Sequence, residues 1–504
     1  MSSATHPESP SAFSHADVLR VISGISLCIL LSALDQTIVA PAIPTIAGDL
    51  GGVAGLSWII SAYLLTSTAA TPIIGKLSDI HGRRTLMLVS IGVFAVASAL
   101  CGLAQSMPQL IAARAVQGLG GAGLVAMAHT TIADVVSPRE RGRYQIYLSG
   151  MWGIASIAGP IVGGAITDHV SWRAIFWVNL PLAVVAFALS RRALAFLPKR
   201  EGPRPRIDMP GAALLTVGVV SWLLVISQGG EGEGWLSAPA LGLLALGAVA
   251  FALLAGQERR AADPLLPPRL FANSVVVRGL VLSFCVTLIT FATTLLLPLH
   301  FQFAQSASAA SSGLLMTPFL LASVVFSYAG GHMARRLGRT RGIMAAAFAA
   351  CAVGLVLLSL IGAGSPTVLT VAWSLLVGGG GGFLLPNITV TVQNAADPRD
   401  VGVATGCMLL LRSTGGAFGA TMAGAIVAWR LSGPLAAAGL PAATGPAVLQ
   451  GRAGVLAGLP ESARAALLGG LDHGFSLAFL IAAGVAALGL LVALTTSDLA
   501  LRSR

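Results

Sequence analysis

The sequence predicts an all-α membrane protein with fourteen transmembrane helices, and two observations support this fold class. Hydrophobic residues make up 55% of the 504-residue chain and charged residues only 10%, whereas a soluble domain usually carries about a quarter charged residues. So few charges cannot cover a surface that faces water. The apolar residues also gather in successive runs, each close to the roughly 20 residues that cross a bilayer as a helix.

The predicted helices follow one another with mostly short, polar connections. They span residues 20–43, 56–74, 85–105, 108–132, 144–167, 173–193, 208–228, 236–256, 275–299, 312–332, 342–362, 367–392, 402–428 and 475–497. We interpret the first run as a helix and not as a removed signal peptide, because no clear small-residue cleavage site follows it. Two connections are longer, a basic, proline-rich link at 194–207 and an Ala-, Gly- and Pro-rich loop at 429–474. Twelve helices are the alternative if residues 208–256 do not span.

The distribution of positive charge supports this count and predicts an orientation. With the amino terminus in the cytoplasm, 23 of the 30 Lys and Arg residues fall on the inner side and 4 on the outer side, as the positive-inside rule requires. We therefore expect both termini in the cytoplasm and residues 429–474 outside. The net charge of +11 then reflects membrane topology, so nucleic acid is not an expected partner.

No pattern in the sequence indicates an enzyme, a cofactor or a metal site. The only Gly-Lys pair, Gly75-Lys76, is followed by Leu77, so a phosphate-binding P-loop is absent. Residues 118–123 fit G-x-G-x-x-G, but they lie in an apolar helix, which excludes a dinucleotide fold and predicts close helix packing. The five cysteines are far apart and predict small core residues without a disulfide or metal role: Cys28, Cys101, Cys285, Cys351 and Cys407.

Two sequence features repeat between the halves of the chain. A basic loop bounded by glycines occurs at residues 75–82 and again at 331–338, and a 24-residue step between glycines occurs at 118–142 and at 378–402. These repeats predict parallel bundles of six helices, with a substrate site near the midplane between them. The predicted division is an N-terminal bundle, a basic linker with two additional helices, and a C-terminal bundle: residues 1–193, 194–272 and 273–504.

Five segments together resemble one transporter family. The loop at residues 75–84 closely resembles the loop between helices 2 and 3 of major facilitator superfamily transporters. Four more segments resemble signatures of the drug:proton antiporter branch, the last being typical of its fourteen-helix members: residues 34–44, 114–118, 153–164 and 172–181. One departure is Arg335, which stands in the second loop at the position of Asp79, so only the first loop can supply that carboxylate. The resemblance covers nearly the whole chain and implies the major facilitator fold, with a proton gradient in place of any cofactor.

Asp35 and Arg114 are the expected proton-coupling residues. Asp35 lies roughly 22 Å along the first helix, in the outer half of the membrane, where a bare carboxylate is costly and is a functional hypothesis by default. Arg114 lies at a comparable depth in the fourth helix and could stabilise the ionised carboxylate. The alternatives are a structural, hydrogen-bonded Asp35 and an Arg114 that only binds backbone carbonyls.

Two glycine-containing groups are expected to take part in conformational change. The resemblance implies a cytoplasmic latch in which the carboxylates pair with arginines or with a helix amino terminus, although Arg84 could serve topology alone: Gly75, Asp79, Gly82, Arg83, Arg84 and Asp134. Small residues and a proline could bend the fifth helix and allow close packing: Gly153, Gly159, Pro160, Gly163 and Gly164.

The expected substrate-cavity residues are polar or aromatic side chains within the spans, and each has packing or helix–helix bonding as its alternative. They are Trp58, Tyr63, His129, Trp152, Phe291, Asn387, Thr391 and Arg412. Asn387, Thr391 and Asn394 form one polar stripe, which faces either the cavity or a neighbouring helix. His129 is the second choice for proton coupling.

From these observations we expect a monomeric secondary transporter that exports apolar or amphipathic compounds in exchange for protons, with the lipid bilayer as its surroundings. The excess of 28 arginines over two lysines is typical of a GC-rich bacterial genome, so we expect a bacterial plasma membrane. A dedicated exporter of one secondary metabolite is the main alternative. A transport-inactive receptor or scaffold is disfavoured because Asp35 and the Asp79 loop are both present.

Overall fold

The computed structural model describes most of the chain: residues 15–50, 56–196, 207–228, 237–303, 309–362, 364–437 and 461–501. No strand occurs in these ranges, and fourteen of their helices are long and apolar enough to cross a membrane. The predicted fold class and number of spans are thus confirmed. The middle of the predicted linker and of the long loop lie outside the described residues.

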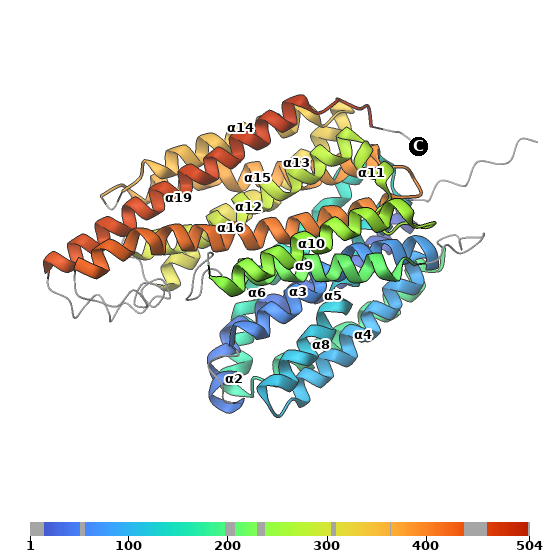
Figure 1. The fold of residues 1–504 in the computed structure, drawn as a ribbon, viewed down its shortest axis with the longest axis horizontal. Coiled ribbons are helices and arrows are strands. Elements are labelled where there is room, and N and C mark those ends of the chain that lie inside the picture. Colours follow the sequence, from blue (N-terminus) through green and yellow to red (C-terminus); the bar gives the residue numbers. More distant parts are fainter. Residues whose placement is uncertain are drawn as a thin grey trace, which may run out of the picture.

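The long helices form two bundles, with a further pair of helices beside them (Figure 1). The first bundle contains α1 (His15–Ile38), α3 (Leu56–His81), α4 (Arg83–Leu103), α5 (Met107–Val135), α6 (Pro138–His169) and α8 (Asn179–Ala193). The second contains α12 (Ser274–Phe303), α13 (Ala309–Leu337), α14 (Arg341–Ser359), α15 (Thr367–Ala395), α16 (Val401–Ala437) and α19 (Glu461–Thr495). The additional pair is α9 (Met209–Gln228) and α10 (Ala238–Arg260), and short helices include α2 (Ile43–Leu50), α7 (Ala174–Trp177) and α11 (Pro268–Ala272).

The two bundles repeat one packing scheme. In the first, α1 packs on α6, and α5 packs on both α3 and α4. In the second, α12 packs on α16, and α15 packs on both α13 and α14. The contacts between bundles follow the same symmetry, since α3 packs on α16 while α13 packs on α6. This is the arrangement that the sequence repeats predict.

The bundles touch closely at the end where α3 joins α4, which we call the Asp79 end. A methyl group on Gly75 of α3 would lie 2.6 Å from the carbonyl oxygen of Gly402 in α16, and one on Gly406 would lie 2.8 Å from Cα of Pro72. Backbones this close require glycine. The small residues therefore allow α3 and α16 to close this end of the molecule.

The bundles have a second contact, between α6 and α13. Ser149 and Ser327 are hydrogen-bonded at 3.2 Å, and a methyl group on Gly153 would lie 3.1 Å from Val324. Further from the Asp79 end, Pro160 of α6 is exposed and Leu314 of α13 is 75% exposed. Figure 1 accordingly shows the bundles converging toward the side that carries the C terminus.

We call the opposite end of the molecule the Asp49 end, after a residue of α2. Trp172 donates a 2.9 Å hydrogen bond to Asp49, and Arg173 forms a 2.6 Å ion pair with the same carboxylate. These two contacts, the Trp172 bond first, hold the pKa of Asp49 below its usual range. A carboxyl with a lowered pKa stabilises the fold above its unfolded-state value, and that stabilisation is lost as the pH falls through the folded-state value.

The additional helices lie across the junction between the bundles. α9 contacts both α3 and α16, and one apolar cluster contains Leu65 of α3, Leu215 of α9 and Leu410 of α16. Asp208 accepts a 3.0 Å hydrogen bond from the backbone N–H of Gly211 and so caps the first turn of α9. The pair α9–α10 thus packs on both partners of the contact at the Asp79 end.

The structure corrects the bounds of the predicted loop at 429–474. α16 continues to Ala437, and α19 begins at Glu461. Buried leucines at helical spacing cause these extensions, because they pack in one cluster: Leu431, Leu435, Leu467 and Leu471. The Arg and Pro residues between them lower the local hydropathy, which is why the sequence alone suggested a loop.

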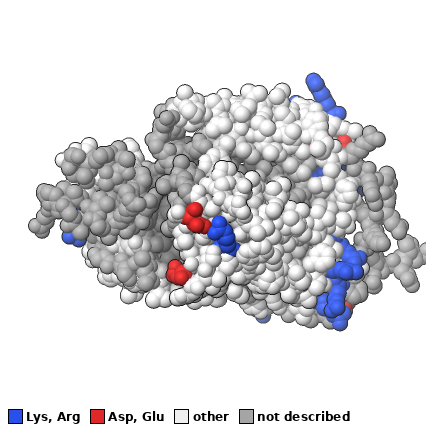
Figure 2. Space-filling model, turned by 90° about the horizontal axis from the view of Figure 1, so that it is seen from below, with Lys and Arg blue, Asp and Glu red and all other residues white. Residues whose placement is uncertain are grey.

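The surface has the character expected of a chain in a bilayer. Figure 2 shows one broad face that is almost uncharged, with Lys and Arg side chains gathered toward the side of the Asp79 end. Large apolar side chains are exposed on the outside of the helices, for example Val96 at 63% and Leu103 at 61% on α4. Exposed apolar side chains of this kind are favourable where they face lipid and unfavourable where they face water.

The proposed orientation predicts a labelling result. The five native cysteines are all buried, so a membrane-impermeant thiol reagent should meet little background. Val170→Cys at the Asp49 end should react in intact cells, whereas His81→Cys at the Asp79 end should react only after permeabilisation. Both positions are exposed in the structure. The reverse pattern would place the Asp79 end outside.

Two adjacent glycines on α6 offer a matched test of helix packing. A methyl group on Gly163 would overlap the carbonyl oxygen of Ile38 on α1, whereas one on Gly164 would have nothing within 4 Å. Gly163→Ala should destabilise the protein by about 1–3 kcal/mol through overpacking, while Gly164→Ala should leave stability unchanged or raise it by up to about 1 kcal/mol, because alanine favours a helix more than glycine does. Thermal unfolding in detergent measures the difference, and equal midpoints would contradict the close contact of α1 with α6.

Candidate functional site

A buried ion pair joins α1 and α5. Asp35 is 0% exposed and Arg114 is 1% exposed, and Arg114 Nη1 lies 2.6 Å from Asp35 Oδ2. The sequence predicted that these two residues lie at a similar depth, and the structure places them in direct contact. An ion pair this deep is stable only when its remaining hydrogen-bonding groups are also satisfied.

Two amide side chains complete the coordination of Asp35. Gln117 Nε2 and Asn179 Nδ2 each donate a 2.8 Å hydrogen bond to Asp35 Oδ1. Asn179 comes from α8 and also donates to Ser98 Oγ on α4 at 3.0 Å. Asp35 therefore accepts three hydrogen bonds and donates none, which is the pattern of an ionised carboxylate. We call Asp35, Arg114, Gln117 and Asn179 the Asp35 network.

Arg114 is held from several sides. Its Nε donates to the carbonyl oxygen of Ile59 on α3 at 3.1 Å, and its Nη1 donates to Gln117 Oε1 at 2.7 Å. Its guanidinium also lies 4.6 Å from the ring centroid of Tyr63, a cation–π distance. The network thus connects α1, α3, α4, α5 and α8 through contacts that include the Asp35 carboxylate.

Tyr63 belongs to the surroundings of this network. It is 1% exposed, and its hydroxyl forms a 3.0 Å hydrogen bond with Ser32 Oγ on α1. A side chain at Gly121 of α5 would overlap the Tyr63 hydroxyl, so that glycine lets α3 and α5 approach. The cavity role of Tyr63 stays a prediction, and in this conformation the side chain has no exposed surface to offer a substrate.

The predicted latch forms a second polar cluster, at the Asp79 end. Arg83 Nη1 lies 2.5 Å from Asp79 Oδ1, and Arg83 Nε lies 2.8 Å from Asp134 Oδ2. Arg83 also donates to Ser78 Oγ at 2.5 Å. One guanidinium therefore joins the end of α3 to the end of α5.

Asp79 also faces the other bundle. A methyl group on Gly402 would lie 2.5 Å from both carboxylate oxygens of Asp79, so the carboxylate lies against the first turn of α16. A carboxylate is stabilised at a helix amino terminus by the helix dipole. Gly82, with φ of 86°, provides the left-handed backbone between α3 and α4. For Arg84, the described residues include no ion-pair partner.

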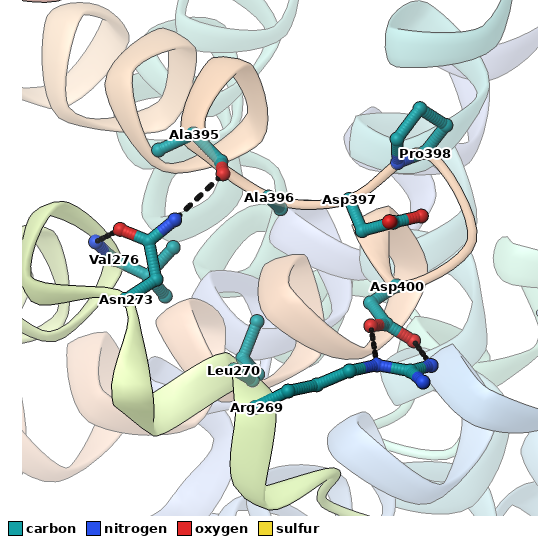
Figure 3. Close-up of a pocket in the computed structure, with 9 residues that line it drawn as sticks. All are labelled: Arg269, Leu270, Asn273, Val276, Ala395, Ala396, Asp397, Pro398 and Asp400. Carbon is teal, nitrogen blue, oxygen red and sulfur yellow. Dashed lines mark hydrogen bonds and ion pairs between the residues drawn. The ribbon is translucent and has the colours of Figure 1, made fainter.

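A cavity of about 350 Å³ lies beside this amino terminus of α16, between α11 and the loop that joins α15 to α16 (Figure 3). Arg269 of α11 forms a two-pronged ion pair with Asp400, at 2.7 and 3.0 Å. Asn273 donates to the carbonyl oxygen of Ala395 at 2.9 Å. The linker after α10 is thereby attached to the segment that meets Asp79.

The glycines of α6 pack against α1 and α13. A side chain at Gly159 would overlap Thr37, whose hydroxyl donates to the carbonyl oxygen of Ala155 at 2.9 Å. Gly163 meets Ile38, as described above, while Gly153 faces Val324 of the other bundle. Pro160 is exposed and lies within a continuous α6. Two residues of the group, Gly159 and Gly163, thus lie at the α1 contact and Gly153 lies at the contact between bundles, whereas Pro160 and Gly164 lie at neither.

His129 of α5 and Arg412 of α16 both contact α15. Arg412 donates to the carbonyl oxygen of Leu385 and to Thr389 Oγ1, both at 2.8 Å. Gln393 Nε2 donates to the carbonyl oxygen of His129 at 3.4 Å and so connects the bundles directly. Thr389 and Gln393 were not predicted from the sequence, although they form a polar i, i+4 pair on α15.

The polar stripe of α15 faces its own bundle. Thr391 Oγ1 forms a 2.7 Å hydrogen bond with Thr340 Oγ1, Asn387 donates to the carbonyl oxygen of Phe383, and Asn394 donates to that of Ala500 at 3.2 Å. Thr391 and Asn394 thus contact neighbouring segments, whereas the Asn387 hydrogen bond lies within α15 itself.

The aromatic residues expected in the cavity pack on other elements. Trp58 lies against the apolar cluster that contains α9, and Trp152 lies against a small cluster around Ala33 of α1. Phe291 is 51% exposed, and its ring would lie 3.0 Å from a methyl group on Gly416. Contact of these three side chains with a substrate stays a prediction.

Comparisons with known proteins agree with this fold. A sequence profile described as Major Facilitator Superfamily matches residues 25–420 and 279–465. The multidrug transporter protein MdtP of Bacillus subtilis is 35% identical over 407 residues, or 81% of this chain and 75% of MdtP. The MFS-type transporter of the acurin A biosynthesis cluster of Aspergillus aculeatus is 31% identical over 415 residues, or 81% of this chain and 74% of that protein.

Among solved structures, the proton:xylose symporter XylE has a similar fold. The TM-score is 0.62, over 96% of this chain and 97% of XylE, at 13% sequence identity. This likeness concerns the fold alone. Since the family profile spans most of the sequence and relatives above 30% identity share it, the chain belongs to the major facilitator superfamily and is a multi-pass membrane transporter, not an enzyme.

Proposed function

We propose that this transporter exports apolar or amphipathic compounds in exchange for protons, with Asp35 as the coupling carboxylate. The observation that carries the proposal is the fully buried Asp35–Arg114 ion pair. Among the described residues, this pair brings a carboxylate and a guanidinium together deep in the spans, and binding of one proton changes the net charge of the pair. Relatives named as a multidrug transporter and as a biosynthesis-cluster transporter support export of small organic molecules.

The coupling follows from electrostatics. In the conformation described here, Asp35 accepts three hydrogen bonds as an ionised carboxylate. Protonation removes the attraction to Arg114 and leaves a guanidinium without a counter-ion in a low-dielectric interior, which is costly. The helices that hold the network must then rearrange to solvate Arg114. A proton taken up from one side can thereby drive the transporter toward its other conformation.

The direction of transport rests on the positive-inside assignment. With the Asp79 end in the cytoplasm, the contacts of α3 with α16 and of α6 with α13 close the cytoplasmic side, and the conformation is outward-facing. Asp35 lies three residues before the end of α1 at Ile38, on the outer half of the membrane in this orientation. Protons would therefore load from outside while substrate leaves.

A dedicated exporter of one secondary metabolite is the second candidate. The name of the Aspergillus aculeatus relative places that transporter in a biosynthesis cluster. A screen in proteoliposomes separates the two candidates: proton movement stimulated by many unrelated compounds favours multidrug efflux, and movement stimulated by one compound favours a dedicated exporter.

Replacing the coupling carboxylate should abolish uphill export. Asp35→Asn mimics the protonated residue, so export driven by a proton gradient should fall at least about tenfold, while a neutral substrate still binds. The variant also leaves Arg114 unpaired, at a cost of about 3–5 kcal/mol. The double variant Asp35→Asn/Arg114→Gln removes both charges and should recover stability but not coupling.

The matched control is Asp49→Asn, which removes a carboxylate at the Asp49 end outside the network. It should retain proton-driven export. Uphill export by Asp35→Asn with the wild-type pH dependence would assign the coupling to another group, with His129 next in order.

Asp79 should affect turnover more than binding. Asp79→Asn keeps the shape of the side chain but removes the charge that pairs with Arg83 and faces the first turn of α16. We expect transport to slow by about tenfold with a substrate Kd within about threefold of wild type, because the change acts on the conformational equilibrium. The separate variant Arg84→Gln, compared in the same assay, should slow transport less than Asp79→Asn does. Normal turnover with much weaker binding would contradict this role for Asp79.

A further inference from the structure

Arg412 of α16 is a cation without a matching carboxylate. Its two hydrogen bonds go to neutral oxygens, those of Leu385 and Thr389 on α15. Its Nε is buried and has no hydrogen-bond partner. Among the described residues no Asp or Glu forms an ion pair with it, whereas Arg114 in the other bundle is fully paired. Arg412 thus adds one uncompensated positive charge to the interior of the transporter.

Two further buried polar atoms, on α5 and α15, are also unpaired. His129 Nδ1 and Gln393 Oε1 are buried without hydrogen-bond partners, and the two residues are 8% and 3% exposed. Gln393 Nε2 joins the His129 carbonyl oxygen to Thr405 Oγ1, at 3.4 and 3.1 Å. These contacts lie at the junction of the two bundles. Arg412, His129, Gln393 and Thr389 are called the Arg412 cluster below.

The cluster lies where the bundles begin to separate. On α16, Gly402 and Gly406 contact α3 closely at the Asp79 end. Ser413 lies seven residues beyond Gly406, on the same helical face, and is exposed. Arg412 beside it is half-buried. Arg412 therefore lies just beyond the layer that closes the Asp79 end, next to an exposed position on the face of α16 that meets α3.

From this geometry we infer that the Arg412 cluster binds an anionic or strongly hydrogen-bond-accepting group of the substrate, so that amphipathic organic anions are preferred over organic cations. The inference rests on the proposed export function and names its substrate class. A carboxylate there would gain charge-assisted hydrogen bonds from a guanidinium that has lost part of its hydration. An organic cation would instead be repelled by a charge that no described acid neutralises.

Arg412 could alternatively serve only to brace α15, since both of its hydrogen bonds go to that helix, at Leu385 and Thr389. Bracing uses the Nη2 donors and leaves Nε unused. It also requires no net charge, so a neutral hydrogen-bonding side chain would serve as well. The two roles differ in one measurable property, which is the dependence of binding on substrate charge.

The test uses the full-length protein in lipid nanodiscs and a panel of amphipathic aromatic compounds. Each aromatic group is supplied as a carboxylate, as its primary amide and as a quaternary ammonium analogue. Ligand-induced shifts of the unfolding midpoint give the affinities of wild type, Arg412→Met and Arg412→Lys. Arg430→Met removes an exposed arginine from the same helix and is the matched control.

Wild type should bind carboxylates at least about tenfold more tightly than the quaternary ammonium analogues, about 1.4 kcal/mol. Arg412→Met should remove that preference, Arg412→Lys should keep part of it, and Arg430→Met should keep all of it. The inference is overturned if wild type binds no carboxylate, if it prefers the ammonium analogues, or if Arg412→Met weakens all three classes equally. Should the neutral amides still drive proton-coupled transport in those cases, the export function stands and only the substrate class is wrong.

Discussion

The buried pair of Asp35 and Arg114 is the interaction on which the rest of the N-terminal bundle depends. Neither side chain reaches water, and their separation of 2.6 Å leaves no room for it. Gln117 and Asn179 donate the other two hydrogen bonds that this carboxylate accepts inside the protein. In the proposed mechanism a proton on Asp35 would leave Arg114 without its counter-ion and so destabilise the packing of the helices around the pair.

α3 and α5 each run from the Asp35 network to the Asp79 end, so the same two helices contribute residues to both. α3 provides the Ile59 carbonyl oxygen at the network and Asp79 at the other end, while α5 provides Arg114 and Asp134. Glycines such as Gly118 bring α3 and α5 so close that a methyl group would overlap Thr66. In the proposed mechanism this close packing would let α3 and α5 move together, so that a change at Asp35 could be passed to the Asp79 end along the helices themselves.

Much of the fold and part of the site could be predicted from sequence, for physical reasons. Spanning length and the placement of positive charge are one-dimensional properties, and both were sufficient for the fourteen helices. Asp35 and Arg114 were found because charge inside an apolar run is costly. Gln117 and Asn179 carry no charge, and Asn179 reaches Asp35 from a helix 144 residues away. The rotation of α15, which turns Asn387 inward and Gln393 toward the other bundle, depends on packing that no periodicity reveals.

The two bundles repeat one architecture but differ in how they treat charge. The N-terminal bundle encloses a cation with its counter-ion, and the C-terminal bundle leaves Arg412 without one among the residues described. A compensated charge is suited to respond to protons, because a single proton unbalances it. An uncompensated charge is suited to respond to ligands, because only an added group balances it. In the proposed mechanism the proton binds in one bundle and the substrate in the other, so the two would not compete for the same side chain, and their coupling would pass through the contact between the bundles.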